Sequence, residues 1–201
     1  LSFCLNLKGD KPDRLTFVQT YDPNYIHYVF NAEEEYVKHG FFEKNEEITL
    51  SGKYSYKWEK QDQNTYINLS TFLPKPDDNG YRDFSVYDYI YINIYSEEKT
   101  SSTFIIALNC QEIEGGKNAY FYYYVTMNFK GWKELKISIR EFTKNNSPDL
   151  SKVTSLCFHS KGWSQMIDPT SVIYIDKFYF VKAKFYFNKS EKKKEIKNEK
   201  R

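Results

Sequence analysis

Cysteine, histidine and long apolar runs are scarce in this 201-residue sequence, and each scarcity argues against a class of protein. The three cysteines, Cys4, Cys110 and Cys157, lie far apart and form no Cys-x-x-Cys pair, so their spacing indicates no metal site. No apolar stretch approaches the roughly 20 residues that a membrane-spanning helix needs. The three histidines are scattered, and no His-Glu-x-x-His or Gly-x-Ser-x-Gly motif occurs. Signals for an enzyme are therefore thin.

Net charge is also small. The formal net charge is +2, and residues 189–201 carry seven Lys or Arg against three Glu, so this stretch holds +4 and the rest of the chain −2. A nucleic-acid platform needs a concentrated basic face, which a nearly neutral body does not supply. We therefore expect no nucleic-acid partner. Residues 188–201 read as a charged linker or tail.

Aromatic residues are abundant instead: the chain holds 19 Tyr, 16 Phe and 3 Trp. They fall in short runs that Gly, Pro, Asn or Asp close, and no run shows the roughly 3.6-residue period of a core helix. Four such runs follow one another within residues 120–181, at spacings that suit an antiparallel sandwich. We predict an all-β fold, an antiparallel β-sandwich over residues 25–187, with residues 1–24 as a lead-in.

Residues 84–95 give the clearest strand pattern in the chain. Every second residue from Ile90 to Ile94 is isoleucine, and successive side chains of a strand point to opposite faces. The isoleucines must therefore face the core, while a tyrosine-rich set faces outward. Tyr122 and Tyr124 alternate in the same way within residues 120–129. Two neighbouring tyrosine ladders are thus expected on the sheet surface.

Three segments resemble motifs of galactose-binding-like jelly-roll domains. Ser51–Trp58 (SGKYSYKW) is similar to their S-G-K-x-S-L-x-W strand, and Phe129–Lys133 with Phe142 to their F-x-G-W segment. Leu150–Phe178 contains counterparts of D-L-S-x-I, G-W and L-Y-I-D-x-I. The set spans about residues 25–182 and resembles the N-terminal domain of chondroitin-type polysaccharide lyases and non-catalytic carbohydrate-binding modules. The resemblance implies a jelly roll in a secreted or cell-surface protein.

Eight residues are candidates for binding sugar. Sugar recognition needs flat apolar rings against the C–H face of a pyranose, with polar groups nearby that reach its hydroxyls. We expect the tyrosine ladders to form such a surface on one outer sheet face, with an arginine and a histidine adding charge or hydrogen bonds. The candidates are Tyr89, Tyr91, Asn93, Tyr95, Tyr122, Tyr124, Arg140 and His159. The alternative is that these tyrosines merely cover a sheet, because tyrosine has a high β propensity.

Asp176 stands in an otherwise apolar strand, where a lone carboxylate would be costly to bury. Some members of the resembling family hold a structural Ca²⁺ between the first and last strands, with an acid near this position and backbone carbonyls. The resemblance therefore implies a possible calcium site at Asp176, which Asn31 or Glu33 could complete with oxygen ligands. The alternative is that Asp176 faces solvent or caps a turn.

The sequence as a whole favours a non-catalytic carbohydrate-binding or accessory domain of a secreted polysaccharide-degrading enzyme of the lyase type. Its partners would be a polysaccharide or oligosaccharide and a catalytic domain of the same chain, to which it would tether substrate. Two alternatives stay open. One is a purely structural domain that packs on a catalytic neighbour. The other is a jelly-roll lyase, which would require a basic, tyrosine-containing concave face on which Arg140, His159 or neighbouring lysines converge.

Overall fold

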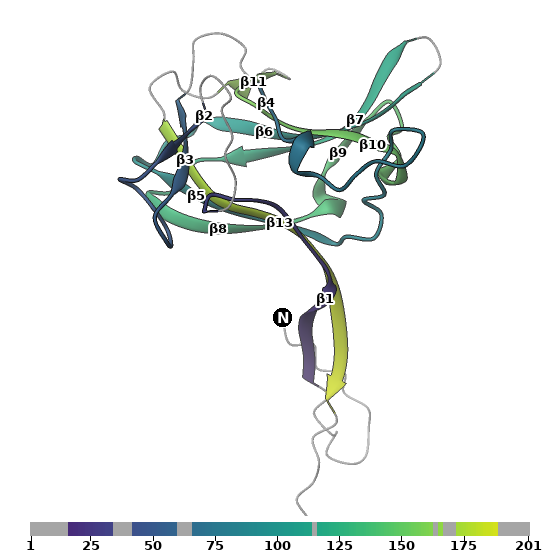
Figure 1. Cartoon of the computed structure of the whole chain (residues 1–201), viewed down its shortest axis with the longest axis horizontal. Helices are drawn as coiled ribbons and strands as arrows, with labels where there is room; N and C mark the ends of the chain where they lie inside the picture. The colour runs from purple at the N-terminus through teal and green to yellow at the C-terminus, as the bar shows by residue number, and fades with distance from the viewer. Residues whose placement is uncertain are drawn as a thin grey trace, which may run out of the picture.

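The computed structural model describes residues 16–33, 42–59, 66–113, 116–162, 165–166 and 172–188. These residues form two antiparallel sheets stacked face to face, with 3-10 turns in the connections (Figure 1). The predicted all-β antiparallel sandwich is confirmed. Within the described ranges no helix has the length and apolar character to cross a membrane. The domain limits at residues 25 and 187 stay a prediction.

The first layer, sheet A, has the strand order β2–β3–β13–β5–β8, and β1 also pairs with β13. Its strands are β1 (Thr16–Asn31), β2 (Phe42–Asn45), β3 (Ser55–Glu59), β5 (Tyr89–Ser96), β8 (Gly131–Ser138) and β13 (Val172–Asn188). On one side β13 pairs with β5. On its other side it pairs first with β3, at residues 172–175, and then with β1, from residue 177 onward. Asp176 therefore lies at the junction where β3 gives way to β1.

The second layer, sheet B, has the order β4–β10–β6–β7–β9. Its strands are β4 (Tyr66–Asn68), β6 (Thr103–Ile113), β7 (Lys117–Thr126), β9 (Thr143–Asn145) and β10 (Val153–His159). A small ribbon of β11 (Lys161–Gly162) and β12 (Gln165–Met166) follows β10. The 3-10 turns are η1 (Ser70–Phe72), η2 (Ile139–Glu141) and η3 (Leu150–Lys152). Because η2 connects β8 to β9, it crosses from the edge of sheet A to the edge of sheet B.

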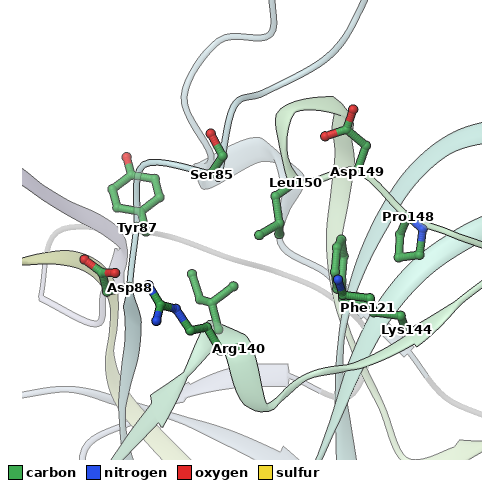
Figure 2. A pocket seen from close by; sticks show the side chains of 10 residues that line it. Ser85, Tyr87, Asp88, Phe121, Arg140, Lys144, Pro148, Asp149 and Leu150 are labelled. Carbon is green, nitrogen blue, oxygen red and sulfur yellow. The ribbon is translucent and has the colours of Figure 1, made fainter.

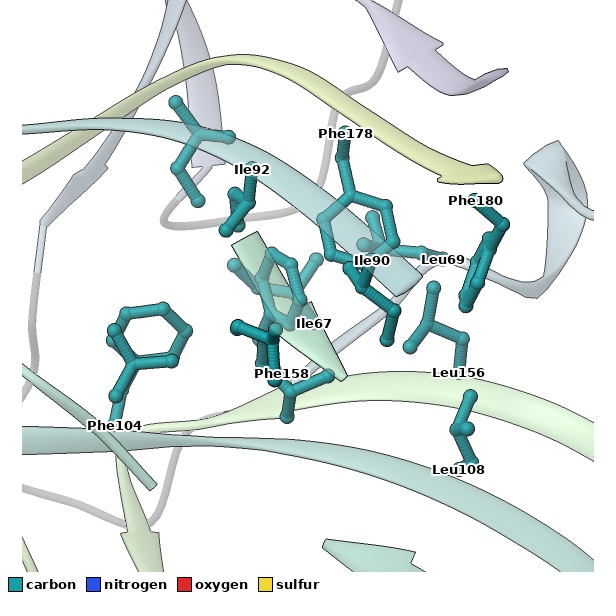
Figure 3. Packing of buried hydrophobic residues seen from close by; sticks show 14 of the residues in the cluster. Ile67, Leu69, Ile90, Ile92, Phe104, Leu108, Leu156, Phe158, Phe178 and Phe180 are labelled. Atoms are coloured by element: carbon teal, nitrogen blue, oxygen red, sulfur yellow. The ribbon is translucent and has the colours of Figure 1, made fainter. Parts of the chain in front are cut away.

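The core lies between the two sheets. Ile90, Ile92 and Ile94 of β5 are fully buried, which confirms that the isoleucine face of this strand points inward. Aromatic side chains from both layers meet them: in the centre of the core the Phe158 ring packs edge-on against Phe178, with 5.4 Å between centroids (Figure 3). Burying one such isoleucine contributes about 1.5–3 kcal/mol, so the alternating pattern of β5 strongly determines which face turns inward.

The first and last strands of the chain, β1 and β13, are longer than the sequence pattern indicated. β1 begins at residue 16, inside the stretch expected to be a lead-in, and β13 continues from residue 172 through residue 188. A register irregularity in β1 falls between Tyr21 and Ile26, around Pro23, which has no N–H for the ladder. Beyond it, residues 16–21 and 183–188 pair as a two-stranded ribbon that projects from the sandwich (Figure 1).

Candidate functional site

The predicted tyrosine ladders lie on opposite outer faces of the molecule, so the expectation of two neighbouring ladders is wrong. β5 belongs to sheet A and β7 to sheet B, and the two layers stack with the core between them (Figure 1). Each strand turns its aliphatic side chains inward and its tyrosines outward. The chain changes layer between β5 and β6, so strands near one another in sequence present their outer faces in opposite directions.

On sheet A the predicted residues of β5 are largely packed against neighbouring side chains. The Tyr91 ring is 5% exposed and stacks on Tyr179, with 5.2 Å between centroids and an interplanar angle of 7°. Tyr95 lies between Trp132 and Tyr174, at 5.6 Å from each. These rings occupy one another's faces and leave little flat surface for a sugar.

The remaining two predicted residues of β5 are also engaged or enclosed. The Tyr89 ring lies under the ammonium group of Lys136, 4.0 Å from its centroid. Asn93 is buried beside Glu134 of β8. Sheet A therefore uses its tyrosines mainly as packing, as the alternative interpretation of the sequence foresaw.

On sheet B the tyrosines of β7 form a row along the strand. Tyr120, Tyr122 and Tyr124 are all half-buried. Tyr122 lies 6.0 Å from Tyr120 and 5.5 Å from Tyr124, and its ring is nearly perpendicular to that of Tyr124. Each ring therefore keeps part of its surface in water while its neighbours restrict its orientation, a favourable state for a stacking platform.

A second aromatic group stands on the opposite side of the same face. Tyr66 of β4 is 62% exposed, and its ring stacks on the imidazole of His159 with 5.9 Å between centroids. His159 pairs in register with Ile105, which pairs with Tyr124, so these side chains form one row across four strands. Three strand spacings separate β4 from β7, or about 14 Å. The sequence pattern did not single out Tyr66, because β4 is only three residues long.

Between the two aromatic groups the central strands carry the buried Ile105 and, further along, smaller side chains. Ala107 and Cys157 are paired across β6 and β10, and Asn109 and Ser155 form the next pair. The Asn109 side-chain amide donates to Ser155 Oγ at 2.8 Å and to Cys157 Sγ at 3.6 Å. This outer surface of sheet B, hereafter the tyrosine face, thus combines rings at both sides with a strip in which buried apolar side chains lie beside the half-buried Asn109 and Ser155. It comprises Tyr66, Ile105, Ala107, Asn109, Tyr120, Tyr122, Tyr124, Ser155, Cys157 and His159.

The imidazole of His159 is neutral at neutral pH. Burial lowers the pKa of His159 below its usual value near 6.5, because its position in the sheet disfavours the charged form. A neutral imidazole has one donor and one acceptor nitrogen, which suits a hydroxyl partner. The tyrosine face therefore offers aromatic and polar uncharged groups.

The structure does not bring Arg140 to this face. Arg140 lies in η2 at one end of the sandwich, where it lines a pocket together with residues of η3, β9 and the loop before β5 (Figure 2). None of the residues of the tyrosine face lines this pocket. Of the eight predicted sugar-binding residues, Tyr122, Tyr124 and His159 share one surface.

The predicted metal-ligating residues do come together at the junction of β3, β1 and β13. Asp176 is 0% exposed, which excludes the alternative that it faces solvent. Its Oδ2 accepts hydrogen bonds from the Ser51 amide at 3.2 Å and the Ser51 hydroxyl at 3.3 Å, so it does cap the turn at residues 51–53. Its Oδ1 is buried and has no hydrogen-bond partner among the described residues.

Glu33 and Asn31 stand beside this carboxylate. Glu33 Oε1 accepts from the backbone amides of Lys53 and Tyr54, both at 2.7 Å, and Asn31 Oδ1 accepts from the Glu33 amide at 3.2 Å. Burial raises the pKa of Asp176, and the nearby charge of Glu33 raises it slightly further. A buried carboxylate oxygen without a partner, near a second carboxylate, fits a hard cation. Within the described ranges, however, no three His, Cys, Asp or Glu side chains cluster closely enough to form a metal site by themselves.

Comparison with known proteins identifies the fold. No protein-family model matches the sequence, and no curated protein matches it. Among solved structures, a family 30 carbohydrate-binding module from a cellulosomal cellulase of Clostridium thermocellum superposes with a TM-score of 0.54 at 17% identity, over 78% of this chain and 97% of that one. A second structure of a family 30 module gives a TM-score of 0.52 at 18% identity, over 83% and 98% of the two chains.

A family 11 carbohydrate-binding module from the same organism, solved with a β-1,3-1,4-mixed-linked tetrasaccharide, gives a TM-score of 0.52 at 14% identity, over 79% of this chain and 96% of that one. At such identities the likeness establishes the architecture: this chain has the β-sandwich jelly-roll fold found in carbohydrate-binding modules. The resemblance to chondroitin-type lyases stays a prediction.

Proposed function

We propose that the tyrosine face of sheet B binds an oligosaccharide or polysaccharide chain. The observation that carries this proposal is the presence of two aromatic groups, Tyr66 with His159 and the tyrosines of β7, on either side of a strip that holds the hydrogen-bonded pair Asn109 and Ser155. The fold likeness to carbohydrate-binding modules supports the same assignment. On sheet A, by contrast, the Tyr91 ring is almost completely enclosed.

Binding on this face would require no chemical step. Pyranose rings would stack with their C–H faces on the exposed Tyr66 ring and on the outer parts of Tyr122 and Tyr124. Hydroxyl groups would exchange hydrogen bonds with Asn109 and the neutral His159 imidazole. Few groups are charged here, so a neutral glycan suits the surface better than a highly charged one.

Such a face would serve as an accessory site. We propose that the domain belongs to a secreted or cell-surface polysaccharide-degrading enzyme, as the sequence resemblance to lyase-associated domains implies, with a catalytic domain on the same polypeptide. Weak binding to a glycan would then raise the local substrate concentration at the catalytic domain. The separate places of Arg140 and His159 in the structure favour this accessory role over a jelly-roll lyase that would use both residues at one site.

Titration calorimetry and affinity gels test the tyrosine face directly. We expect mixed-linked β-glucan or another soluble neutral glycan to bind, and both Tyr66→Ala and Tyr122→Ala to weaken binding about tenfold, the effect of losing one aromatic contact. Tyr89→Ala on sheet A is the matched control and should bind normally. Equal losses in all three variants would overturn the assignment, as would no retention on any polysaccharide of a broad panel. The absence of binding to every polysaccharide would favour the interpretation as a purely structural domain.

We further propose that Asp176 and Glu33 hold a structural Ca²⁺, with Asn31 close by. The support is the buried Asp176 Oδ1, which has no partner among the described residues. When bound, the ion would neutralise the two carboxylates and connect β1 to β13, and the chain itself would supply the side-chain oxygens. Calcium binds six to eight oxygens as a rule, so backbone carbonyls and waters would complete the shell.

Calcium should raise the melting temperature of the protein above that measured in EDTA, whereas Asp176→Asn should melt at the same temperature in both. Ligand linkage predicts the size: Ca²⁺ at 100 times its Kd adds about 2.7 kcal/mol to the free energy of unfolding. Mg²⁺ provides the control for a nonspecific ionic effect. Identical melting temperatures of the unmodified protein in Ca²⁺ and in EDTA would contradict the proposed calcium site. Protonation of the Asp176 carboxyl would then be the explanation for its burial.

A further inference from the structure

A pocket of about 410 Å³ opens at the end of the sandwich where η2 crosses between the two sheets. Figure 2 shows Tyr87, Asp88 and Arg140 on one side of this end pocket and Asp149 on the other. The volume lies within the range of roughly 300–1,000 Å³ that small-ligand sites occupy. The end pocket is separate from the tyrosine face and from Asp176, so neither proposed site accounts for it.

Two cationic side chains at the end pocket lack a carboxylate partner. Arg140 and Lys144 are both exposed, and neither forms an ion pair with any described Asp or Glu. Lys144 belongs to the edge strand β9 opposite Phe121 of β7, and its ammonium group lies 5.9 Å from the centroid of that ring. Lys144 therefore turns toward the inner side of its sheet, at the mouth of the pocket.

The acidic side chains of the pocket are already held by the protein. Asp88 Oδ2 accepts the amide of Ala183 at 2.9 Å. Asp149 Oδ1 accepts the amide and hydroxyl of Ser151, at 2.9 and 2.8 Å, and these bonds hold the pKa of Asp149 below its usual value. In each acid these bonds fix one carboxylate oxygen, whereas neither cation forms an ion pair with a described carboxylate.

The floor of the pocket is apolar. Ile139 and Phe121 belong to the buried core, and Leu150 packs against it. The end pocket therefore offers an apolar base, two hydrogen-bonded carboxylates and two cations. A compact ring that carries hydroxyl groups and one carboxylate matches these three features together. A neutral sugar would leave the cations unpaired, and a small inorganic anion would leave the apolar base uncovered.

We propose that the end pocket binds a uronic acid unit of an acidic glycan, with its carboxylate at Arg140 and with Lys144 adding positive charge from the other side of the pocket. The guanidinium group binds the carboxylate through charge-assisted hydrogen bonds. The sugar ring covers Ile139 and Leu150, and its hydroxyls donate to Asp88 and Asp149. An inward lysine on an edge strand also protects that strand from aggregation, but this explanation does not extend to Arg140, which lies in η2 and not in a strand.

Backbone amide NMR shifts of the full chain, titrated with sodium D-glucuronate, D-glucose and sodium acetate, test this assignment. Glucuronate should shift the amides of Ser85, Ile139 and Leu150 and bind at least about tenfold more tightly than either glucose or acetate. Arg140→Gln and Lys144→Gln should each weaken glucuronate binding severalfold. Lys99→Gln, an exposed lysine on a distant loop, is the matched control and should have no effect.

Each other outcome overturns the proposal in a defined way. If glucose binds as tightly as glucuronate, the carboxylate contributes nothing to binding. If acetate binds as tightly as glucuronate, the sugar ring contributes nothing. No shifts near residues 85, 139 and 150, or unchanged binding in both pocket variants, removes the site. Tyr122→Ala distinguishes binding in the end pocket from binding on the tyrosine face. It should leave glucuronate binding unchanged whether or not the tyrosine face binds glycan.

Discussion

The Asp176 carboxyl is enclosed in sheet A with one oxygen hydrogen-bonded to Ser51 and the other without a described partner. Lys177 is the adjacent positive group, and its ammonium donates to Ser51 Oγ at 3.0 Å. Burial raises the pKa of Asp176 above its usual value near 3.8 despite this cation. At a pH between the unfolded-state and folded-state pKa values, the Asp176 carboxyl of the metal-free folded protein therefore holds a proton more often than it does in the unfolded chain.

This difference predicts how stability depends on pH. Because the folded-state pKa of Asp176 is the higher one, its contribution to stability is full below about pH 3.8 and declines as the pH rises toward the folded-state value. In EDTA, the melting temperature should fall less steeply with rising pH in Asp176→Asn than in the unmodified protein. Asp78→Asn, in an exposed loop, is the control and should follow the unmodified curve.

Calcium should reverse the trend for the unmodified protein, because the ion binds only the deprotonated carboxylate. Thermal denaturation between pH 4 and pH 8, with EDTA and with Ca²⁺, measures both effects. Parallel curves for the Asp176 and Asp78 variants in EDTA would contradict the predicted pKa shift.

At the scale of an element, the turn before β3 depends on a glycine. Gly52 has a φ of +71°, and a Cβ atom built there would lie 2.5 Å from Oε1 of Glu33. Glycine thus allows both the left-handed backbone and the close approach of the carboxylate that accepts the Lys53 and Tyr54 amides. The turn holds β3 and the end of β1 together beside Asp176.

Gly80 provides a matched comparison for Gly52. Its φ is +83°, but a Cβ atom there would meet nothing within 4 Å. Gly80→Ala should cost only the left-handed strain, about 1–2 kcal/mol, whereas Gly52→Ala should cost more, because Glu33 must also move. Urea denaturation measures both free energies of unfolding. Equal losses would show that the contact with Glu33 carries no energetic weight.

The arrangement of the strands explains which sequence predictions failed. Alternation correctly separates the inward isoleucines of β5 from its outward tyrosines, because the pattern depends only on the local geometry of a strand. Alternation says nothing about which sheet a strand joins. β5 and β7 therefore appeared to be neighbours, although one belongs to each layer.

Tyr66 and Asn109 were not identified from the sequence, and the reason is equally specific. Tyr66 belongs to a three-residue strand, and its importance arises from the His159 ring of β10, more than 90 residues later in the chain. Asn109 acquires its place from hydrogen bonds to Ser155 and Cys157 on another strand. No local pattern could have indicated either contact.

For the whole molecule, the two layers give two separate candidate sites. The tyrosine face has rings on both sides of the strip that holds Asn109 and Ser155, and we propose an extended neutral chain as its ligand. The end pocket has two cations above an apolar base, and we propose a single charged sugar unit there. A domain with both sites could bind a glycan chain along the tyrosine face and one of its uronic acid units in the end pocket. The two contacts together would orient the glycan toward an attached enzyme.

The sequence by itself determined the all-β character of the chain and the inward faces of its strands. It also placed at Asp176 a carboxylate that is costly to bury. These features depend on hydrophobic alternation and on the cost of burying charge, which act at every strand independently of topology. Only the tertiary structure decided that Tyr122 and His159 share a face with Tyr66, that Tyr91 is enclosed, and that Arg140 lines a separate pocket. Those outcomes depend on strand order and layer crossing, which long-range packing selects.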